Sequence, residues 1–204
     1  MAKEIELKAH VYDSESMKKL LMEKAAYSCA FEKEDIYWLR SKSSQSSSCL
    51  PAPVSKIRLR KESLTFPNGS KRETILATYK AKEITDGIEV NEEVEFAVTP
   101  ANEFECLLGA FGFVPESRKR KCGWAFVSGE ITIELAEVDN LGFFIELEIL
   151  YDHVDEGGKG ENVITAAKEK LLVLLHDLGV GKDAIESRYY SQMLKQQHQG
   201  SNLP

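Results

Sequence analysis

The first residues that could do chemistry lie near the N-terminus, where charged side chains alternate with aliphatic ones. In the segment EIELK, Glu4, Glu6 and Lys8 occupy every second position, with Ile5 and Leu7 between them. In a β-strand this spacing places two carboxylates and an amine on one face and the aliphatic side chains on the other. Carboxylate oxygens bind Mg²⁺ and Mn²⁺, and amines bind phosphate, so this face either meets solvent or binds ions.

The same alternation recurs along the chain in six further segments. They are KIRLRKE, ATYKAKE, NEEVEFAV, RKRKCGWAF, EITIEL and FFIELEI. A solvated face explains the pattern on any single strand of an antiparallel sheet. Here, however, the polar positions are almost wholly ionisable, and same-sign pairs at i and i+2 repel unless opposite charges lie between them.

These charges would share one compartment if the sheet curled so that the charged face became its interior. The acidic members would be Glu4, Glu6, Asp35, Glu93, Glu95, Glu134, Glu146 and Glu148. The basic members would be Lys8, Arg58, Arg60, Lys80, Lys82, Lys119 and Lys121, which leaves a net charge of −1. Because dry burial costs several kcal/mol per ion, we expect a wet interior that binds ions. Two divalent cations would bring this interior to a charge that suits a triphosphate of about −4.

Short strands and a few helices must position these residues. We expect strands over 2–10, 34–40, 54–62, 74–83, 88–97, 117–127, 130–137 and 143–151. We expect helices over 14–27, 100–111 and 162–178, with a shorter one after Asp183. The first has an apolar stripe at helical spacing, and the third ends before Gly179, a favourable C-terminal signal.

Composition indicates one domain. The chain has 204 residues, of which 43% are hydrophobic, enough for a substantial core. We assign residues 1–195 to this domain, with a flexible serine-rich insertion at 41–53 and a polar tail at 196–204. The four cysteines lack metal-ligand spacing, and no signal peptide or membrane span is evident, so we expect a cytoplasmic protein. The net charge of −7 disfavours nucleic-acid binding.

The ordered set of motifs resembles the CYTH superfamily, the triphosphate tunnel metalloenzymes. EIELK matches the family's E-x-E-x-K signature, and YYSQML is similar to its closing S-Y-x-x-L-L. The intervening matches are EDIYW, KIRLRKE, TYKAKE, EEVEF and ELAEVDNLGFFIELE. The resemblance implies an α+β fold, an eight-stranded antiparallel β-barrel with helices packed outside, and it covers residues 2–194. The order and spacing of these motifs are most similar to those of the class IV adenylyl cyclase branch.

The resemblance also implies roles for the charged residues, with Mg²⁺ or Mn²⁺ as cofactor. The metal ligands would be Glu4, Glu6, Glu134, Glu146 and Glu148. The phosphate-binding residues would be Arg58, Arg60, Lys82, Lys119 and Lys121, with Lys8 and Lys80 as catalytic residues. Secondary roles would fall to Glu93, Glu95, Asp35 and Tyr190.

Two departures from the family pattern leave the reaction open. Ala136 stands where the family usually has Asp, and lysines replace part of a K-x-R pair before Trp124. Conversion of ATP to cyclic AMP and pyrophosphate is our first expectation. Hydrolysis of inorganic or thiamine triphosphate is the close second, and a non-catalytic nucleotide or polyphosphate binder is the third. We expect a small-molecule triphosphate as partner and leave a homodimer open.

Overall fold

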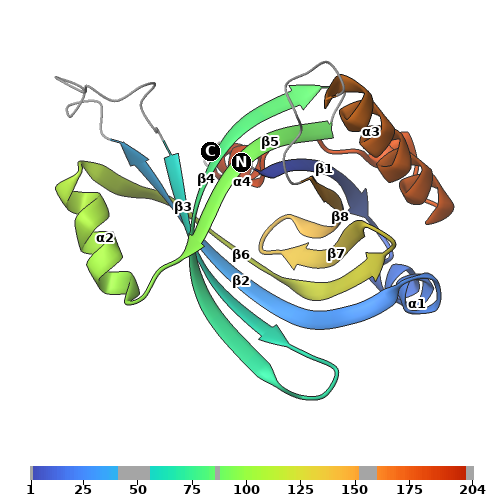
Figure 1. The fold of residues 1–204 in the computed structure, drawn as a ribbon, viewed down its shortest axis with the longest axis horizontal. Coiled ribbons are helices and arrows are strands. Elements are labelled where there is room, and N and C mark those ends of the chain that lie inside the picture. The colour runs from blue at the N-terminus through green and yellow to red at the C-terminus, as the bar shows by residue number, and fades with distance from the viewer. Residues whose placement is uncertain (1, 41–55, 86–87, 152–159, 201–204) are drawn as a thin grey trace.

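The strands close into a barrel (Figure 1). The structure is a computed structural model that describes residues 2–40, 56–85, 88–151 and 160–200. All neighbouring strands are antiparallel, in the order β1-β5-β4-β3-β2-β6-β7-β8. Their bounds are β1 Ala2–Val11, β2 Ala26–Arg40, β3 Lys56–Thr65, β4 Lys71–Thr85, β5 Ile88–Ala97, β6 Phe113–Ser128, β7 Ile131–Val138 and β8 Gly142–Tyr151. The predicted eight-stranded antiparallel barrel with helices outside is confirmed.

The predicted strand positions are right in order, but β2 begins well before residue 34. It starts at Ala26, directly after the first helix. Glu34 is exposed on the outer face of β2, whereas Lys33 is buried on the inner face. Charged residues therefore occupy successive positions of β2, on both of its faces. For this reason the alternation of charged and apolar residues seen in the other strands is not visible in this segment.

In the part of the chain that the structure describes, four α-helices lie outside the barrel. They are α1 Ser14–Lys24, α2 Ala101–Ala110, α3 Gly160–Asp177 and α4 Tyr190–Gly200, with a 3₁₀ turn at Lys182–Ala184. Residues 196–200, which we expected in a polar tail, belong to α4. The predicted insertion at 41–53 lies outside the described residues. None of the helices in the described part of the chain combines the length and apolarity that a membrane crossing requires.

The main hydrophobic core lies between the barrel wall and the helices α1 and α3. Ile5 of β1 and Leu147 of β8 are fully buried there, against Leu21 of α1 and Leu171 of α3. These strand residues have the parity opposite to the charged ones, so the apolar face of the sheet points outward. The helices cover it and thereby remove it from water.

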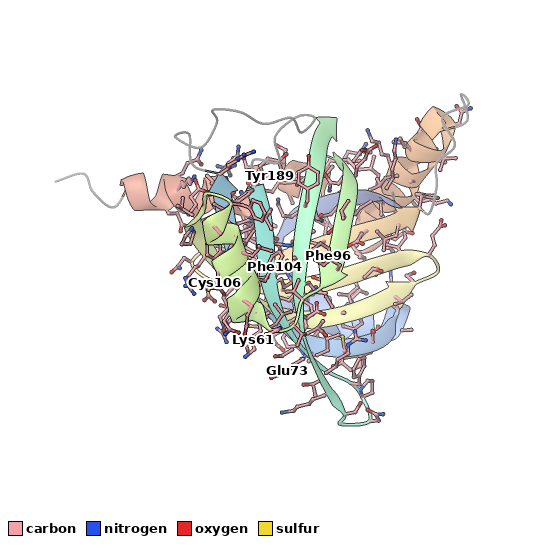
Figure 2. The ribbon with its side chains drawn as sticks, turned by 60° about the vertical axis from the view of Figure 1, so that its left-hand side comes forward. Lys61, Glu73, Phe96, Phe104, Cys106 and Tyr189 are labelled. Atoms are coloured by element: carbon pink, nitrogen blue, oxygen red, sulfur yellow. The ribbon has the colours of Figure 1, made fainter. Side chains whose placement is uncertain are left out.

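A second external core lies under α2. Trp38, Leu59 and Leu108 pack together there. At its margin the rings of Phe96 on β5 and Phe104 on α2 meet edge to face, with centroids 6.2 Å apart (Figure 2). Both cores lie on the outer face of the sheet, so the side chains of its inner face line the barrel interior.

Part of that interior is apolar. Cys29, Phe31, Leu64, Ala125 and Ala136 form a separate buried cluster, here called the apolar plug. Each lies two or four positions along its strand from an inward-facing charged residue, so the plug lies on the inner face of the barrel beside the charged residues. Ala136, which stands where the family usually has Asp, is therefore one of the residues of this apolar plug.

Beside the plug, β6 and β7 approach each other closely at Gly123, which pairs with Ala136. A Cβ atom at Gly123 would lie 2.1 Å from the Leu135 carbonyl oxygen and 2.7 Å from the Ala136 Cα. Both obstructing atoms belong to the backbone, so they cannot turn aside.

We predict that Gly123→Ala lowers the free energy of unfolding by about 1–3 kcal/mol or more, because the strands must separate to admit the methyl group. Urea denaturation followed by circular dichroism measures this. Gly109→Ala is the matched control: apart from its chain neighbours and the backbone of α2 itself, no atom lies within 4 Å of its Cβ position. It should raise stability by about 0.5–1 kcal/mol. Equal midpoints for Gly123→Ala and the wild type would contradict the close approach.

Candidate active site

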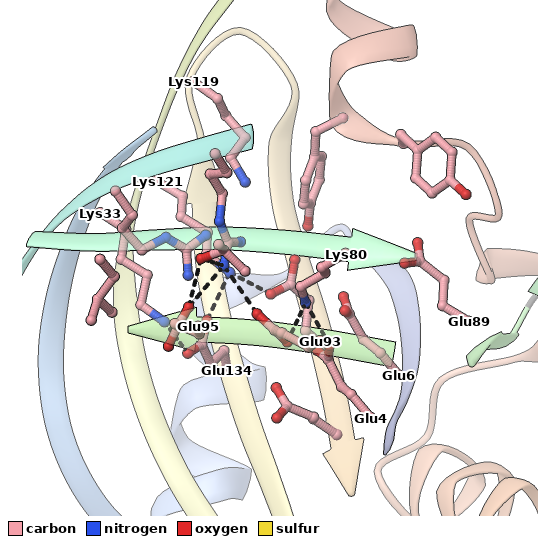
Figure 3. A pocket seen from close by; sticks show the side chains of 18 of the residues that line it. Glu4, Glu6, Lys33, Lys80, Glu89, Glu93, Glu95, Lys119, Lys121 and Glu134 are labelled. Carbon is pink, nitrogen blue, oxygen red and sulfur yellow. Dashed lines mark hydrogen bonds and ion pairs between the residues drawn. The ribbon is translucent and has the colours of Figure 1, made fainter. Parts of the chain in front are cut away.

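A cavity of about 680 Å³ occupies the charged section of the barrel. Figure 3 shows its side chains converging from the surrounding strands. The predicted residues that line it are Glu4, Glu6, Lys8, Arg58, Arg60, Lys80, Glu93, Glu95, Lys119, Lys121, Glu134, Glu146, Glu148 and Tyr190. Asp35 lies behind the lining, in contact with Arg60 and Lys119. Lys82 belongs to β4, and its side chain lies outside the described part of the structure.

Sequence reasoning missed four charged residues that also line the cavity: Lys33, Lys56, Glu62 and Glu89. Each has the inward parity of a residue that was found. Lys33 lies two positions from Asp35, Lys56 two from Arg58, Glu62 two from Arg60 and Glu89 four from Glu93. Following the inward parity through the expected strands 54–62 and 88–97 would have found Lys56, Glu62 and Glu89, whereas Lys33 lies one residue before the expected strand 34–40.

One wall of the cavity is basic and is organised around Asp35. The Asp35 carboxylate accepts hydrogen bonds from Arg60 Nε at 2.7 Å and Arg60 Nη2 at 3.0 Å, and Lys119 Nζ lies 3.0 Å away. These partners lie opposite Asp35 on β3 and β6. Burial raises the pKa of Asp35, but Lys119 and Arg60 outweigh it and hold that pKa well below its usual range. Asp35 therefore stays ionised and fixes two cations at the cavity wall.

A second buried network continues this wall. Glu134 accepts from Lys33 Nζ at 2.5 Å through one oxygen and from Lys121 Nζ at 2.7 Å through the other. Lys121 also donates to Glu146. Burial opposes ionisation of Glu134, but Lys121 and Lys33 dominate and lower its pKa. Both oxygens of Glu134 are thus held by lysines, which are positioned as donors toward the cavity.

The opposite wall is acidic. Glu6 lies directly across from Glu148 on β8 and from Glu89 on β5. Like charges at such positions destabilise a sheet. Burial and the nearby Glu4 and Glu6 carboxylates raise the pKa of Glu148 to about 8. In Figure 3, Glu4, Glu6 and Glu89 lie on the side of the cavity away from Lys33, Lys119 and Lys121.

The donor chemistry of the acidic wall fits a divalent cation. Glu4, Glu6 and Glu148 offer hard oxygen ligands of the kind Mg²⁺ and Mn²⁺ prefer, and their mutual repulsion would be relieved by one. Among the described residues, no group of three or more His, Cys, Asp or Glu side chains is already arranged around a common point. One reason is that Glu4 is paired with Lys80, whose Nζ lies 2.5 Å from Glu4 and 3.1 Å from Glu93.

Arg58 and Lys8 occupy the borders of the cavity. Arg58 Nη2 donates to Thr78 Oγ1 at 3.1 Å and to Glu95 at 3.3 Å. Lys8 Nζ donates to the Arg188 carbonyl oxygen at 2.7 Å, and so contacts the segment that leads into α4. Lys8 thus lines the cavity, and its amine also holds the chain that leads into α4.

A second cavity of about 350 Å³ adjoins the first. The two share Tyr37, Lys119 and Ser191. The second is also lined by Ser117 and by Asn140 in the turn between β7 and β8. The Ser117 hydroxyl is buried without a hydrogen-bond partner among the described residues.

Solved structures resemble this chain over almost its whole length. The PH1819 protein from Pyrococcus horikoshii OT3 has a TM-score of 0.71 and 26% identity, over 95% of this chain and 99% of that one. A Vibrio parahaemolyticus protein, described as a candidate adenylate cyclase, has a TM-score of 0.67 and 18% identity, over 94% and 97%. This chain has the CYTH, or triphosphate tunnel, fold.

A plant protein has the same fold. HpAC1 from Hippeastrum, described as a candidate adenylyl cyclase with a dominant triphosphatase activity, has a TM-score of 0.59 and 16% identity, over 95% and 94%. At these identities the likeness establishes the fold alone. No protein-family model and no curated protein sequence matches the chain. The function of the tunnel must therefore be argued from its own residues.

The basic wall yields a stability prediction. Asp35→Ala would leave Arg60 and Lys119 buried without their common counterion, and we expect it to lower the free energy of unfolding by about 3–5 kcal/mol. Glu32→Ala is the matched control: it breaks the exposed pair with Arg120 and should cost less than about 1 kcal/mol. Urea denaturation measures both. Equal losses in the two variants would show that Asp35 does not organise the wall.

Proposed function

We propose that this protein is a divalent-metal-dependent enzyme that cleaves a triphosphate. The observation that carries the proposal is the opposition of a basic and an acidic wall across one cavity. A polyphosphate chain needs several cationic donors on one side, whereas the metal that accompanies it needs carboxylates. A fold shared with HpAC1 and the Vibrio protein adds support.

The residues of the two walls would divide the work. Arg60, Lys119 and Lys121 are already fixed by buried carboxylates, so they would bind phosphate oxygens with little reorganisation. Glu4, Glu6 and Glu148 would hold the divalent cation, which when bound supplies charge neutralisation and lowers the pKa of a coordinated water. Lys80 is paired with Glu4, and we assign it to the phosphates next to the metal.

Hydrolysis is the outcome that the main cavity supports most directly. Most of its lining residues are charged and suit a polyphosphate chain with its metal, whereas Leu76, Leu150 and three tyrosine rings supply the apolar part of its surface. A water molecule needs no further binding site. The products of hydrolysis would be a diphosphate and orthophosphate.

Cyclisation of ATP is the second candidate. It requires a nucleoside held so that the ribose 3′-hydroxyl meets the α-phosphate. The second cavity offers the room, with Tyr37 at the junction and the Ser117 hydroxyl in its wall. The sequence resemblance to the class IV adenylyl cyclase branch also favours this reaction.

A product assay tests the proposal. Purified protein would be offered ATP, inorganic triphosphate and thiamine triphosphate separately, with Mg²⁺ or Mn²⁺, and the products resolved chromatographically. Orthophosphate without cyclic AMP establishes a triphosphatase, and cyclic AMP with pyrophosphate establishes the cyclase. Absence of every product from all three substrates would contradict the enzymatic proposal, and binding measured separately would then identify a non-catalytic binder.

The acidic wall predicts that one substitution affects activity far more than stability. Glu6→Gln removes repulsion from Glu89 and Glu148 but also the attraction to Lys80, so it should change the melting temperature little. It should nevertheless lower metal-dependent turnover at least 100-fold, because a metal ligand is lost. Glu130→Gln, which alters an exposed pair with Lys170, is the control and should have wild-type turnover. Wild-type turnover in Glu6→Gln would contradict the assignment of Glu6 as a metal ligand.

The basic wall predicts a pH dependence. Burial lowers the pKa of Lys119 to about 8; Asp35 raises it, and Lys121 lowers it further. As the pH rises through 8, Lys119 loses its charge in the free enzyme, so kcat/KM should fall. The profile would be measured at saturating divalent metal, since Glu148 ionises over the same range. Lys119→Arg, which stays charged, should shift this decline to higher pH; an unchanged profile would exclude Lys119 as its source.

A further inference from the structure

Tyr190 is placed at the cavity by a segment that is fastened to β1. The Glu186 amide donates to the Lys8 carbonyl oxygen at 2.8 Å, and Ile185 forms a β-bridge with Ala9. Lys8 Nζ in turn donates to the Arg188 carbonyl oxygen. These contacts fix the backbone just before α4, so the first side chain of that helix enters the tunnel in a defined position.

The Tyr190 ring is held on several sides. It meets Phe144 edge to face, with ring centroids 5.0 Å apart and an interplanar angle of 82°. Lys8 Nζ lies 4.5 Å and Lys119 Nζ 4.9 Å from the ring centroid. Tyr190 is 8% exposed. Phenylalanine would preserve all these ring contacts, so packing alone does not explain a tyrosine here.

The hydroxyl is the unexplained part of the side chain. It is buried and has no hydrogen-bond partner among the described residues. Such a group destabilises a folded protein unless a ligand or another molecule satisfies it. The Glu146 carboxylate is close enough to raise the pKa of the hydroxyl, but no hydrogen bond of good geometry joins the two groups, and Lys121 holds Oε2 of that carboxylate. Burial, with Glu146 nearby, raises the pKa of the phenol well above its usual value, so the hydroxyl is available as a donor.

A donor at this place has an evident acceptor once the cavity is filled. Tyr190 lines the same cavity as Lys119 and Lys121, the cations assigned to phosphate. We propose that the Tyr190 hydroxyl donates a hydrogen bond to an anionic phosphoryl oxygen of the bound triphosphate. The proposal rests on the proposed function and extends it, because it makes α4 part of the substrate-binding site.

Removing only the hydroxyl tests this assignment. Tyr190→Phe and the wild type would be titrated by calorimetry with bis-methylene triphosphate and excess Mg²⁺, since the P–C–P bridges of this analogue cannot be hydrolysed. We expect the dissociation constant to rise at least tenfold, as for the loss of a hydrogen bond to a charged group. The melting temperature of the ligand-free variant should be unchanged or higher, because an unsatisfied buried hydroxyl has been removed.

Tyr27→Phe is the matched control. Its ring also meets a phenylalanine edge to face, with Phe126 at 5.6 Å, but on the outside of the barrel. Analogue affinity should be unaffected in this variant. A Tyr190→Phe protein that binds the analogue as tightly as the wild type overturns the inference, while the proposed function stands. A wild type that neither binds the analogue nor cleaves any triphosphate overturns both.

Discussion

The pairing of opposite charges inside a closed barrel is the constraint on which the rest of this structure depends. A buried ion is tolerated only when counterions surround it. Asp35 meets this requirement, because Arg60 and Lys119 both contact its carboxylate. The same demand places Glu134 between Lys33 and Lys121. Because charged side chains occupy much of the inner face of the sheet, the main hydrophobic cores lie on its outer face, beneath the helices.

Positive and negative charges are unevenly distributed between the two walls of the barrel. This uneven distribution indicates that the cavity binds charged ligands. On the basic wall, buried carboxylates satisfy the cations and orient them. On the acidic wall, Glu6 faces Glu89 and Glu148 across neighbouring strands. A metal ion would relieve the second wall and a polyphosphate would occupy the first, so one ligand complex completes both. The Tyr190 hydroxyl fits the same view, as a donor that the ligand-free protein leaves unsatisfied.

Much of this arrangement could be predicted from the sequence, because a strand has a period of two and a charged inner face shows that period directly. Glu4, Glu6, Arg58 and Lys121 were placed in the cavity on parity alone. Lys33 was missed because charges also occupy the neighbouring outer positions, which conceals the alternation. Parity also cannot tell where along the barrel a residue lies, and so it could not place Ala136 in the apolar plug. The position of α4 depends on long-range contacts with β1, which no local pattern records.

The most direct test of this account is a crystal structure with bis-methylene triphosphate and Mn²⁺, in which anomalous scattering locates the metal. We predict phosphate oxygens on Arg60, Lys119 and Lys121, and Mn²⁺ on carboxylates of the opposite wall. An analogue bound outside the barrel, or a metal bound away from Glu4, Glu6 and Glu148, would contradict the claim that the two charged walls form one metal–triphosphate site.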